Sequence, residues 1–178
     1  MSRYIPLALS LFIGACPAFA EPPQLNTNYA EPEETVWAES NYTLPPFPKD
    51  ENLAEFSVGG VSATKYYVDK TAIGAGTPDE IVRYVMVVKT AGGAINTSYE
   101  GIRCDTNEYR IYATGTRDGT WSKSRITEWR KFQPYNQQQK SLANFYFCPE
   151  FHAIKTAEEG LDALRRGMHP AVAAKYAQ

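Results

Sequence analysis

The sequence predicts an α+β domain built on an antiparallel β-meander of four to five strands, with C-terminal helices and one disulfide bond. Three observations support this prediction. Between residues 56 and 121, strand-forming runs alternate with short turns, which favours antiparallel neighbours over crossover units. Near the C-terminus, apolar residues recur at helical spacing. Two cysteines remain once the N-terminal segment is set aside, and they form an even pair.

Length and composition limit the class of protein. The chain has 178 residues, enough for one domain of ordinary size. Its 18 basic and 20 acidic residues nearly balance, which excludes a histone-like polycation and gives no reason to expect a nucleic-acid partner. The hydrophobic content of 43 % and aromatic content of 13 % exclude a wholly disordered chain.

Residues 1–20 have the features of a secretory signal peptide. Arg3 precedes an uncharged apolar run, and Ala18-Phe19-Ala20 places small residues where a signal peptidase cleaves. We therefore expect an exported protein with no transmembrane segment in the mature chain. The alternative is a membrane-anchored lipoprotein, because Ile13-Gly14-Ala15-Cys16 resembles a lipobox in which the cysteine is lipidated.

Cleavage after Ala20 leaves Cys104 and Cys148. Export exposes this pair to oxidising conditions, which predicts a disulfide. Closing a loop of about 45 residues would stabilise the fold by about 4 kcal/mol in the chain-entropy model. The alternative is two separate buried thiols. The sequence contains no CxxC motif and no Cys/His cluster at zinc spacing, so no metal and no cofactor is predicted.

Residues 21–55 differ from the rest of the chain. They hold six prolines and carry one lysine against eight acids, whereas the chain from residue 56 onward has a net charge of +4. Proline removes backbone donors, so this stretch is not expected to form a regular helix or a central strand. We expect residues 21–36 to form a Pro-rich, acidic, flexible arm. The aromatic part from Trp37 to Phe47 is expected to dock on a basic face of the domain; the alternative is a solvated linker.

The predicted strands follow one another with short connections. Residues 81–89 are apolar at nearly every position, which is typical of a central strand. Gly92-Gly93 indicates a two-residue hairpin, and Asp118-Gly119 indicates another tight turn. In chain order, the predicted strands are residues 64–69, 81–89, 95–104, 109–114 and a short one at 120–121.

The last third of the chain is predicted to be helical. Residues 125–142 are polar and compatible with a helix. Thr156 and Glu159 have the spacing of a capping box, and Gly167 followed by His169-Pro170 predicts the end of a helix. The apolar face of this helix is formed by Ile154, Ala157, Leu161, Leu164 and Met168.

Four segments together resemble the cryptic neisserial protein-like (CNP-like) family. They are IVRY at 81–84, YEGIRC at 99–104, GTRDGTW at 115–121 and FYFC at 145–148. With Trp37 and Leu44-Pro45, the resemblance covers residues 33–150. The family comprises exported proteins of Gram-negative bacteria that share a domain of unknown function. The resemblance therefore implies a periplasmic location and a common fold, with residues 37–150 as the CNP-like domain and 151–178 as a C-terminal helical extension. It assigns no catalytic residue.

Basic and aromatic residues interleave between residues 117 and 131, where the net charge is +3. Cations beside aromatic rings hold phosphates and sugars, and export argues against nucleic acid. The alternative is a solvated face with two tryptophans packed inward. The candidate ligand-binding residues are Arg117, Trp121, Lys123, Arg125, Trp129 and Arg130.

Charged residues in the central strands form a second candidate group. Glu100 and Arg103 fall on opposite faces of their strand. Arg83 on the neighbouring strand is expected to pair with Glu100 across the hairpin, either as a grip for a charged ligand or as a structural ion pair.

The sequence contains no P-loop, nucleophile elbow, HExxH or GxGxxG motif, and His152 and His169 have no metal-ligand spacing. We therefore expect a non-catalytic binding or interaction module whose partner is a glycan, lipid or protein of the cell envelope. The alternative is a cell-wall or glycan hydrolase that uses carboxylates, because such residues meet in space rather than in sequence.

Overall fold

The computed structural model describes residues 36–60, 62–76 and 78–177. The chain divides into two units, Met1–Val36 and Trp37–Gln178, and every described helix and strand lies in the second. The expected signal peptide, Cys16 and nearly all of the expected acidic arm lie outside the described residues. The strands are β1 (Leu53–Phe56), β2 (Lys65–Asp69), β3 (Ile81–Lys89), β4 (Ile95–Arg103), β5 (Glu108–Gly115), β6 (Trp121–Lys123) and β7 (Arg130–Lys131).

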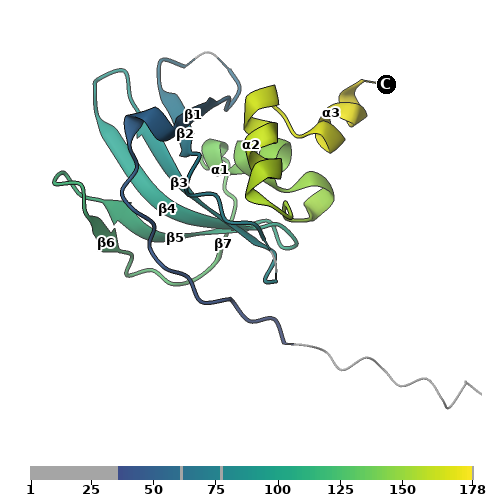
Figure 1. Ribbon diagram of the computed structural model, residues 1–178, viewed down its shortest axis with the longest axis horizontal. Helices are drawn as coiled ribbons and strands as arrows, with labels where there is room; N and C mark the ends of the chain where they lie inside the picture. The colour runs from purple at the N-terminus through teal and green to yellow at the C-terminus, as the bar shows by residue number, and fades with distance from the viewer. Residues whose placement is uncertain (1–35, 61, 77, 178) are drawn as a thin grey trace, which may run out of the picture. The chain divides into compact units, whose positions relative to one another are not determined.

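The seven strands form one antiparallel sheet in the order β1-β2-β3-β4-β5-β6, with β7 also paired to β5 (Figure 1). The predicted meander is therefore confirmed, and β3 is a central strand with β2 and β4 on either side. The sheet has two strands more than the expected five, β1 and β7, which are only four and two residues long. Runs this short show no alternation that a sequence pattern can detect.

Apart from η1, which precedes β1, the helical segments follow the sheet and cover one of its faces (Figure 1). Val82 and Tyr84 of β3 and Ile102 of β4 point to this face and pack against Leu142 and Phe147 of the helical layer. The segments are the π-helical η2 (Leu142–Phe147), the 3-10 helices η1 (Asp50–Asn52) and η3 (Pro149–Phe151), and the α-helices α1 (Gln137–Ser141), α2 (Ala157–Arg166) and α3 (Pro170–Tyr176).

The opposite face of the sheet is covered by residues 37–47, which we call the strap. Val85 and Val87 of β3 and Tyr99 of β4 form a second apolar cluster on this face, and Leu44 of the strap packs against it. Because both faces of β3 are buried, the strand has to be apolar at consecutive positions, which explains its sequence. The strap therefore docks on the domain, as its aromatic residues predict.

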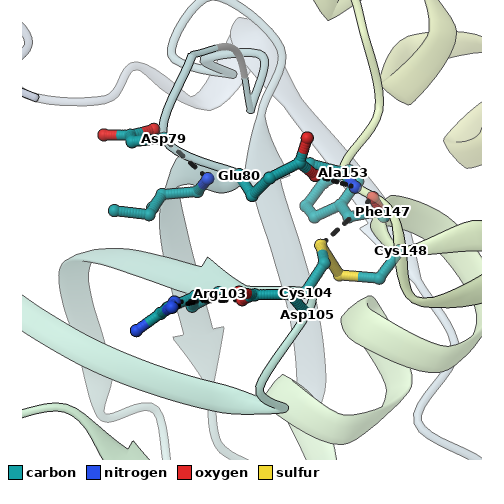
Figure 2. The surroundings of a disulfide bond; sticks show 9 residues. Asp79, Glu80, Arg103, Cys104, Asp105, Phe147, Cys148 and Ala153 are labelled. Carbon is teal, nitrogen blue, oxygen red and sulfur yellow. Dashed lines mark hydrogen bonds and ion pairs between the residues drawn. A yellow bond between two sulfur atoms is a disulfide. The ribbon is translucent and has the colours of Figure 1, made fainter. Parts of the chain in front are cut away.

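A disulfide bond joins Cys104, at the end of β4, to Cys148, which follows η2 (Figure 2). The two Cα atoms lie 5.4 Å apart, and both cysteines are buried. Close by, the backbone N–H of Ala153 donates to the carboxylate of Glu80 at 3.0 Å. The predicted disulfide is thus confirmed, and it ties the sheet to the helical layer.

Helix α2 begins and ends as its sequence predicts. The hydroxyl of Thr156 accepts from the N–H of Glu159 at 3.1 Å, and Gly167 ends the helix with a φ of +77°. His169 and Pro170 follow this end and also begin the next helix, because Nδ1 of His169 accepts from the N–H of Ala171 and caps α3. The C-terminal segment therefore contains two helices, α2 and α3, and the predicted C-terminal helices are confirmed.

Two other local predictions are wrong. The β3–β4 hairpin has a three-residue loop, Ala91-Gly92-Gly93. The residues on either side of this loop are paired, since the N–H of Thr90 donates to the carbonyl of Ala94. Gly93 takes a φ of +81°, which a three-residue loop requires at its last position. Most of residues 125–142 is irregular, and only α1 (Gln137–Ser141) is helical before η2 begins.

Candidate functional site

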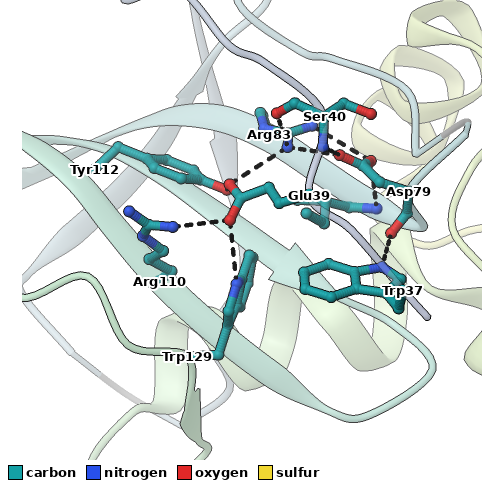
Figure 3. A network of polar contacts seen from close by, with 9 residues as sticks. Trp37, Glu39, Ser40, Asp79, Arg83, Arg110, Tyr112 and Trp129 are labelled. Carbon is teal, nitrogen blue, oxygen red and sulfur yellow. Dashed lines mark hydrogen bonds and ion pairs between the residues drawn. The ribbon is translucent and has the colours of Figure 1, made fainter.

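Charged side chains gather beneath the strap, between it and strands β3 and β5 (Figure 3). This is the face on which the strap covers the sheet. We call the group the Glu39 network. Its members are Glu39 of the strap, Asp79 just before β3, Arg83 of β3, Arg110 and Tyr112 of β5, and Trp129 just before β7.

The carboxylate of Glu39 receives hydrogen bonds from four side chains. Nη1 of Arg110 donates to it at 2.8 Å and the hydroxyl of Tyr112 at 2.8 Å. The indole N–H of Trp129 and Nη2 of Arg83 donate at 3.3 and 3.5 Å. This is an arrangement of cationic and neutral donors that holds a carboxylate in a fixed orientation.

Asp79 fixes the strap from the other side of Arg83. Its carboxylate accepts from Nη2 of Arg83 at 2.7 Å and from the backbone N–H of Ser40 at 2.8 Å. Its carbonyl accepts from the indole of Trp37 at 2.9 Å. Burial opposes ionisation of Asp79, but the hydrogen bonds from Arg83 and Ser40 hold its pKa below the ordinary value.

In the Glu39 network, the positive charges of two arginines are matched by the negative charges of two carboxylates, and the side chains are largely shielded from solvent. The side chains of Arg83 and Arg110 are only 11 % and 16 % exposed. Although burial disfavours its charge, Arg83 has a raised pKa because Asp79 accepts its hydrogen bonds. Burial, and then the hydrogen bond to Glu39, raises the pKa of Tyr112, which therefore stays protonated and donates. Within the described residues, the Nε groups of Arg83 and Arg110 are buried without a hydrogen-bond partner.

Two glycines make room for this arrangement. A Cβ on Gly101 of β4 would lie 2.7 Å from the hydroxyl oxygen of Tyr112. A Cβ on Gly115, at the end of β5, would lie 2.9 Å from the ring of Phe47 in the strap. Both separations are far shorter than van der Waals contact, so glycine is required for Tyr112 to reach Glu39 and for the strap to lie flat on the sheet.

The residues predicted to bind a ligand separate into two groups. Four are exposed cations around the β5–β6–β7 edge of the sheet, and we call them the basic surface: Arg117, Lys123, Arg125 and Arg130. They do not share one face of the sheet, because Lys123 lies opposite Ala113 on the strap side and Arg130 lies opposite Tyr109 on the side of the helical layer. The two tryptophans, by contrast, hold the strap. Trp121 donates to the carbonyl of Pro45 at 2.8 Å, and Trp129 donates to Glu39.

The expected pair between Arg83 and Glu100 does not form. In the β3–β4 register Arg83 lies opposite Gly101, and Glu100 lies opposite Tyr84, so the two charges point to different faces of the sheet. Arg83 pairs with Asp79 and Glu39 instead.

The other two charges of this group have separate roles. Arg103 pairs with Asp105 at 3.0 Å, and its guanidinium lies 3.8 Å above the ring of Trp37. Glu100 is buried beneath the helical layer, where Ser98 Oγ donates at 2.6 Å and Gln139 and Tyr84 donate at 3.1 Å. Burial raises the pKa of Glu100, despite these hydrogen bonds.

Both histidines line a cavity of about 460 Å³ beside α2 and α3, together with Glu80, Glu150 and Glu159. Both ring nitrogens of His169 are engaged, since Nδ1 accepts from Ala171 and Nε2 lies 3.0 Å from Glu159. Burial opposes ionisation of Glu159, but the hydrogen bonds from the Lys155 N–H and from His169 keep its pKa low.

Across the part of the chain that the structure describes, no three His, Cys, Asp or Glu side chains come together as a metal site. In the same ranges, no helix combines the length and the apolar character that crossing a membrane requires.

The fold and site define a small α+β domain with a disulfide bond, a bond typical of proteins outside the reducing cytoplasm. The model of the CNP1-like family matches residues 32–165. The chain therefore belongs to the CNP1-like family, whose function is not established. The match continues past residue 150, where the resemblance was expected to end, and includes nearly all of α2. Searches of curated proteins and of solved structures find no significant match.

Proposed function

We propose that the protein is an exported, non-catalytic binding module of the cell envelope, which holds an anionic component on the basic surface. One observation carries the proposal. Among the described residues, Arg117, Lys123, Arg125 and Arg130 form no ion pair, whereas the arginines of β3, β4 and β5 all do. Cations that the fold leaves uncompensated are available to a partner.

Within the described residues, the two acids of the same stretch form no ion pair with these cations. Asp118 accepts from the hydroxyls of Thr116 and Thr120 and so belongs to its own turn. Glu128 accepts from the backbone N–H of Thr127.

A cavity of about 120 Å³ lies beside the basic surface. Ile111 and Ile126 contribute apolar side chains to its lining, which also includes the charged residues Arg110, Glu128 and Arg130.

The test is a titration of the mature protein against lipopolysaccharide and against peptidoglycan fragments, at low and high salt. Arg125→Glu should weaken binding by about fivefold or more, since one cation near an anionic surface contributes about 1 kcal/mol. Lys155→Glu is the matched control, because Lys155 is an exposed cation just before α2. Absent binding, salt-independent binding or an equal effect of both variants would contradict the proposal.

The acidic arm of residues 21–36 is proposed to compete for this surface. It carries four acids and no basic residue, so its deletion should strengthen binding at low salt. Equal affinities with and without the arm would show that it does not compete.

The proposed location is the periplasm, reached by cleavage after Ala20. Sequencing of the protein from an envelope fraction should begin at Glu21. A lipidated N-terminus at Cys16 would instead identify a membrane-anchored lipoprotein.

The second candidate function is a carboxylate-dependent cell-wall or glycan hydrolase. The cavity beside α2 supports it, because Glu80, Glu150 and Glu159 line that space. Release of soluble fragments from peptidoglycan, lost in Glu80→Gln and kept in Arg125→Glu, would favour the hydrolase over the binding module.

A further inference from the structure

The strap contacts the sheet as a bound peptide does, and not as one of its strands. It belongs to none of the seven strands. At one end the ring of Trp37 lies beneath the guanidinium of Arg103 at 3.8 Å. At the other end Pro45 accepts from the indole of Trp121, and the ring of Phe47 packs 5.1 Å from that of Trp121.

The contacts between these ends combine a fixed backbone with one selective side chain. The N–H of Ser40 donates to Asp79 at 2.8 Å, and its carbonyl accepts from Arg83 at 3.3 Å. These bonds hold an extended backbone whatever its sequence. Selectivity comes from Glu39, because Arg83, Arg110, Tyr112 and Trp129 all donate to its carboxylate.

We propose that this face of the sheet is a peptide-binding groove for a Trp-x-Glu segment, filled here by the chain's own strap, and that it accepts the strap of a second copy of this chain in trans when its own strap is weakened. The same contacts form in either arrangement. The strap joins the body only through Pro48 and Lys49 before η1 begins. Proline keeps such a connection extended, and exchange of a terminal segment is a low-cost route to dimers.

In the wild-type protein the strap in cis has a large advantage. A segment attached by a short connection has an effective concentration on the order of millimolar, so a strap in trans at micromolar concentration cannot compete. Exchange becomes visible only when the cis strap is impaired in one chain and the groove is impaired in the other.

The test mixes two full-length variants of the mature protein. Glu39→Ala keeps an intact groove but lacks the strap carboxylate, and Arg110→Ala keeps an intact strap but has a defective groove. At about 100 µM each, every variant alone should be monomeric by light scattering, and the mixture should contain a one-to-one dimer. A mixture that stays monomeric overturns the proposal.

A second groove variant guards against misfolding. Tyr112→Phe removes only the hydroxyl that donates to Glu39 and keeps the ring in place, so it replaces Arg110→Ala if that chain lacks a cooperative melt.

A synthetic peptide of residues 36–48 provides the specificity control. It should bind the Glu39→Ala chain and dissolve the mixed dimer, whereas the same peptide with Glu39→Gln should bind at least tenfold more weakly. Equal binding of the two peptides would overturn the carboxylate site. Neither result depends on the basic surface, so the proposed function stands or fails separately.

Discussion

Replacing Glu39 by glutamine tests how much the network beneath the strap contributes to stability. The substitution keeps the shape of the side chain but removes its charge and one of its two acceptor oxygens. These oxygens accept the two hydrogen bonds of 2.8 Å from Arg110 and Tyr112. Hydrogen bonds to charged groups contribute about 1.5–3 kcal/mol each, and breaking a buried ion pair costs more than its net value because a charge is left unpaired. With Glu39 and Arg110 each 16 % exposed, we expect Glu39→Gln to lower the free energy of unfolding by about 2–4 kcal/mol.

The chain contains a matched control for this experiment. Glu55 and Lys65 form an ion pair at 2.7 Å, as short as the Glu39–Arg110 pair, but their side chains are 48 % and 54 % exposed. Water screens an exposed pair, so Glu55→Gln should cost no more than about 1 kcal/mol. The comparison separates the effect of burial from the effect of distance.

The assay is urea unfolding followed by tryptophan fluorescence and by circular dichroism. An unchanged m value would show that the variant exposes the same surface area on unfolding as the wild type. A loss below about 1 kcal/mol for Glu39→Gln, or equal losses for the two variants, would refute the reasoning. It would mean that the Glu39 carboxylate adds little to the aromatic contacts and the other hydrogen bonds that hold the strap.

Further measurements address the disulfide, the core and the buried acid. Non-reducing peptide mapping should show Cys104 joined to Cys148 in protein from cells, and alkylation of both thiols without reductant would contradict this. Val85→Asp should give insoluble or degraded protein, because it buries an unpaired charge in a fully covered strand; a normal yield and melting temperature would be inconsistent with that burial. Gly101→Ala should cost about 1–3 kcal/mol by crowding Tyr112, measured by the same urea titration. Glu100→Gln should stabilise the protein at neutral pH. Because burial raises the folded pKa of Glu100, the wild type loses stability as pH rises through that pKa. The gain in melting temperature should therefore vanish below about pH 4, and a gain independent of pH would show that Glu100 does not titrate on unfolding.

The sequence predicts the parts of the fold that local patterns determine. β3 was predictable with its bounds because a strand covered on both faces is apolar at nearly every position. The cap at Thr156 and the end of α2 at Gly167 follow from short-range hydrogen bonding and backbone conformation. β1 and β7 were not predictable, because their place in the sheet depends on their partners and not on any period of their own.

The candidate site is formed by contacts between parts of the chain that are far apart in sequence. For this reason the sequence alone does not predict the Glu39 network. Glu39 meets Arg110 and Trp129 at separations of 71 and 90 residues, and no spacing singles it out from the other acids of residues 21–55. The docking of an acidic, aromatic segment on a basic face was the usable signal. The Arg83–Glu100 prediction failed through a register difference of one residue, which moves a side chain to the other face of a strand.

The disulfide also determines how the domain responds to a pulling force. Cys104 and Cys148 are 44 residues apart in sequence, and an extended residue contributes about 3.3–3.6 Å of contour length. When the oxidised chain is pulled from its two ends, the disulfide therefore prevents about 150 Å of contour length from extending. The strap lies outside that closed loop, so it can be peeled from the sheet while the region between the two cysteines stays shut.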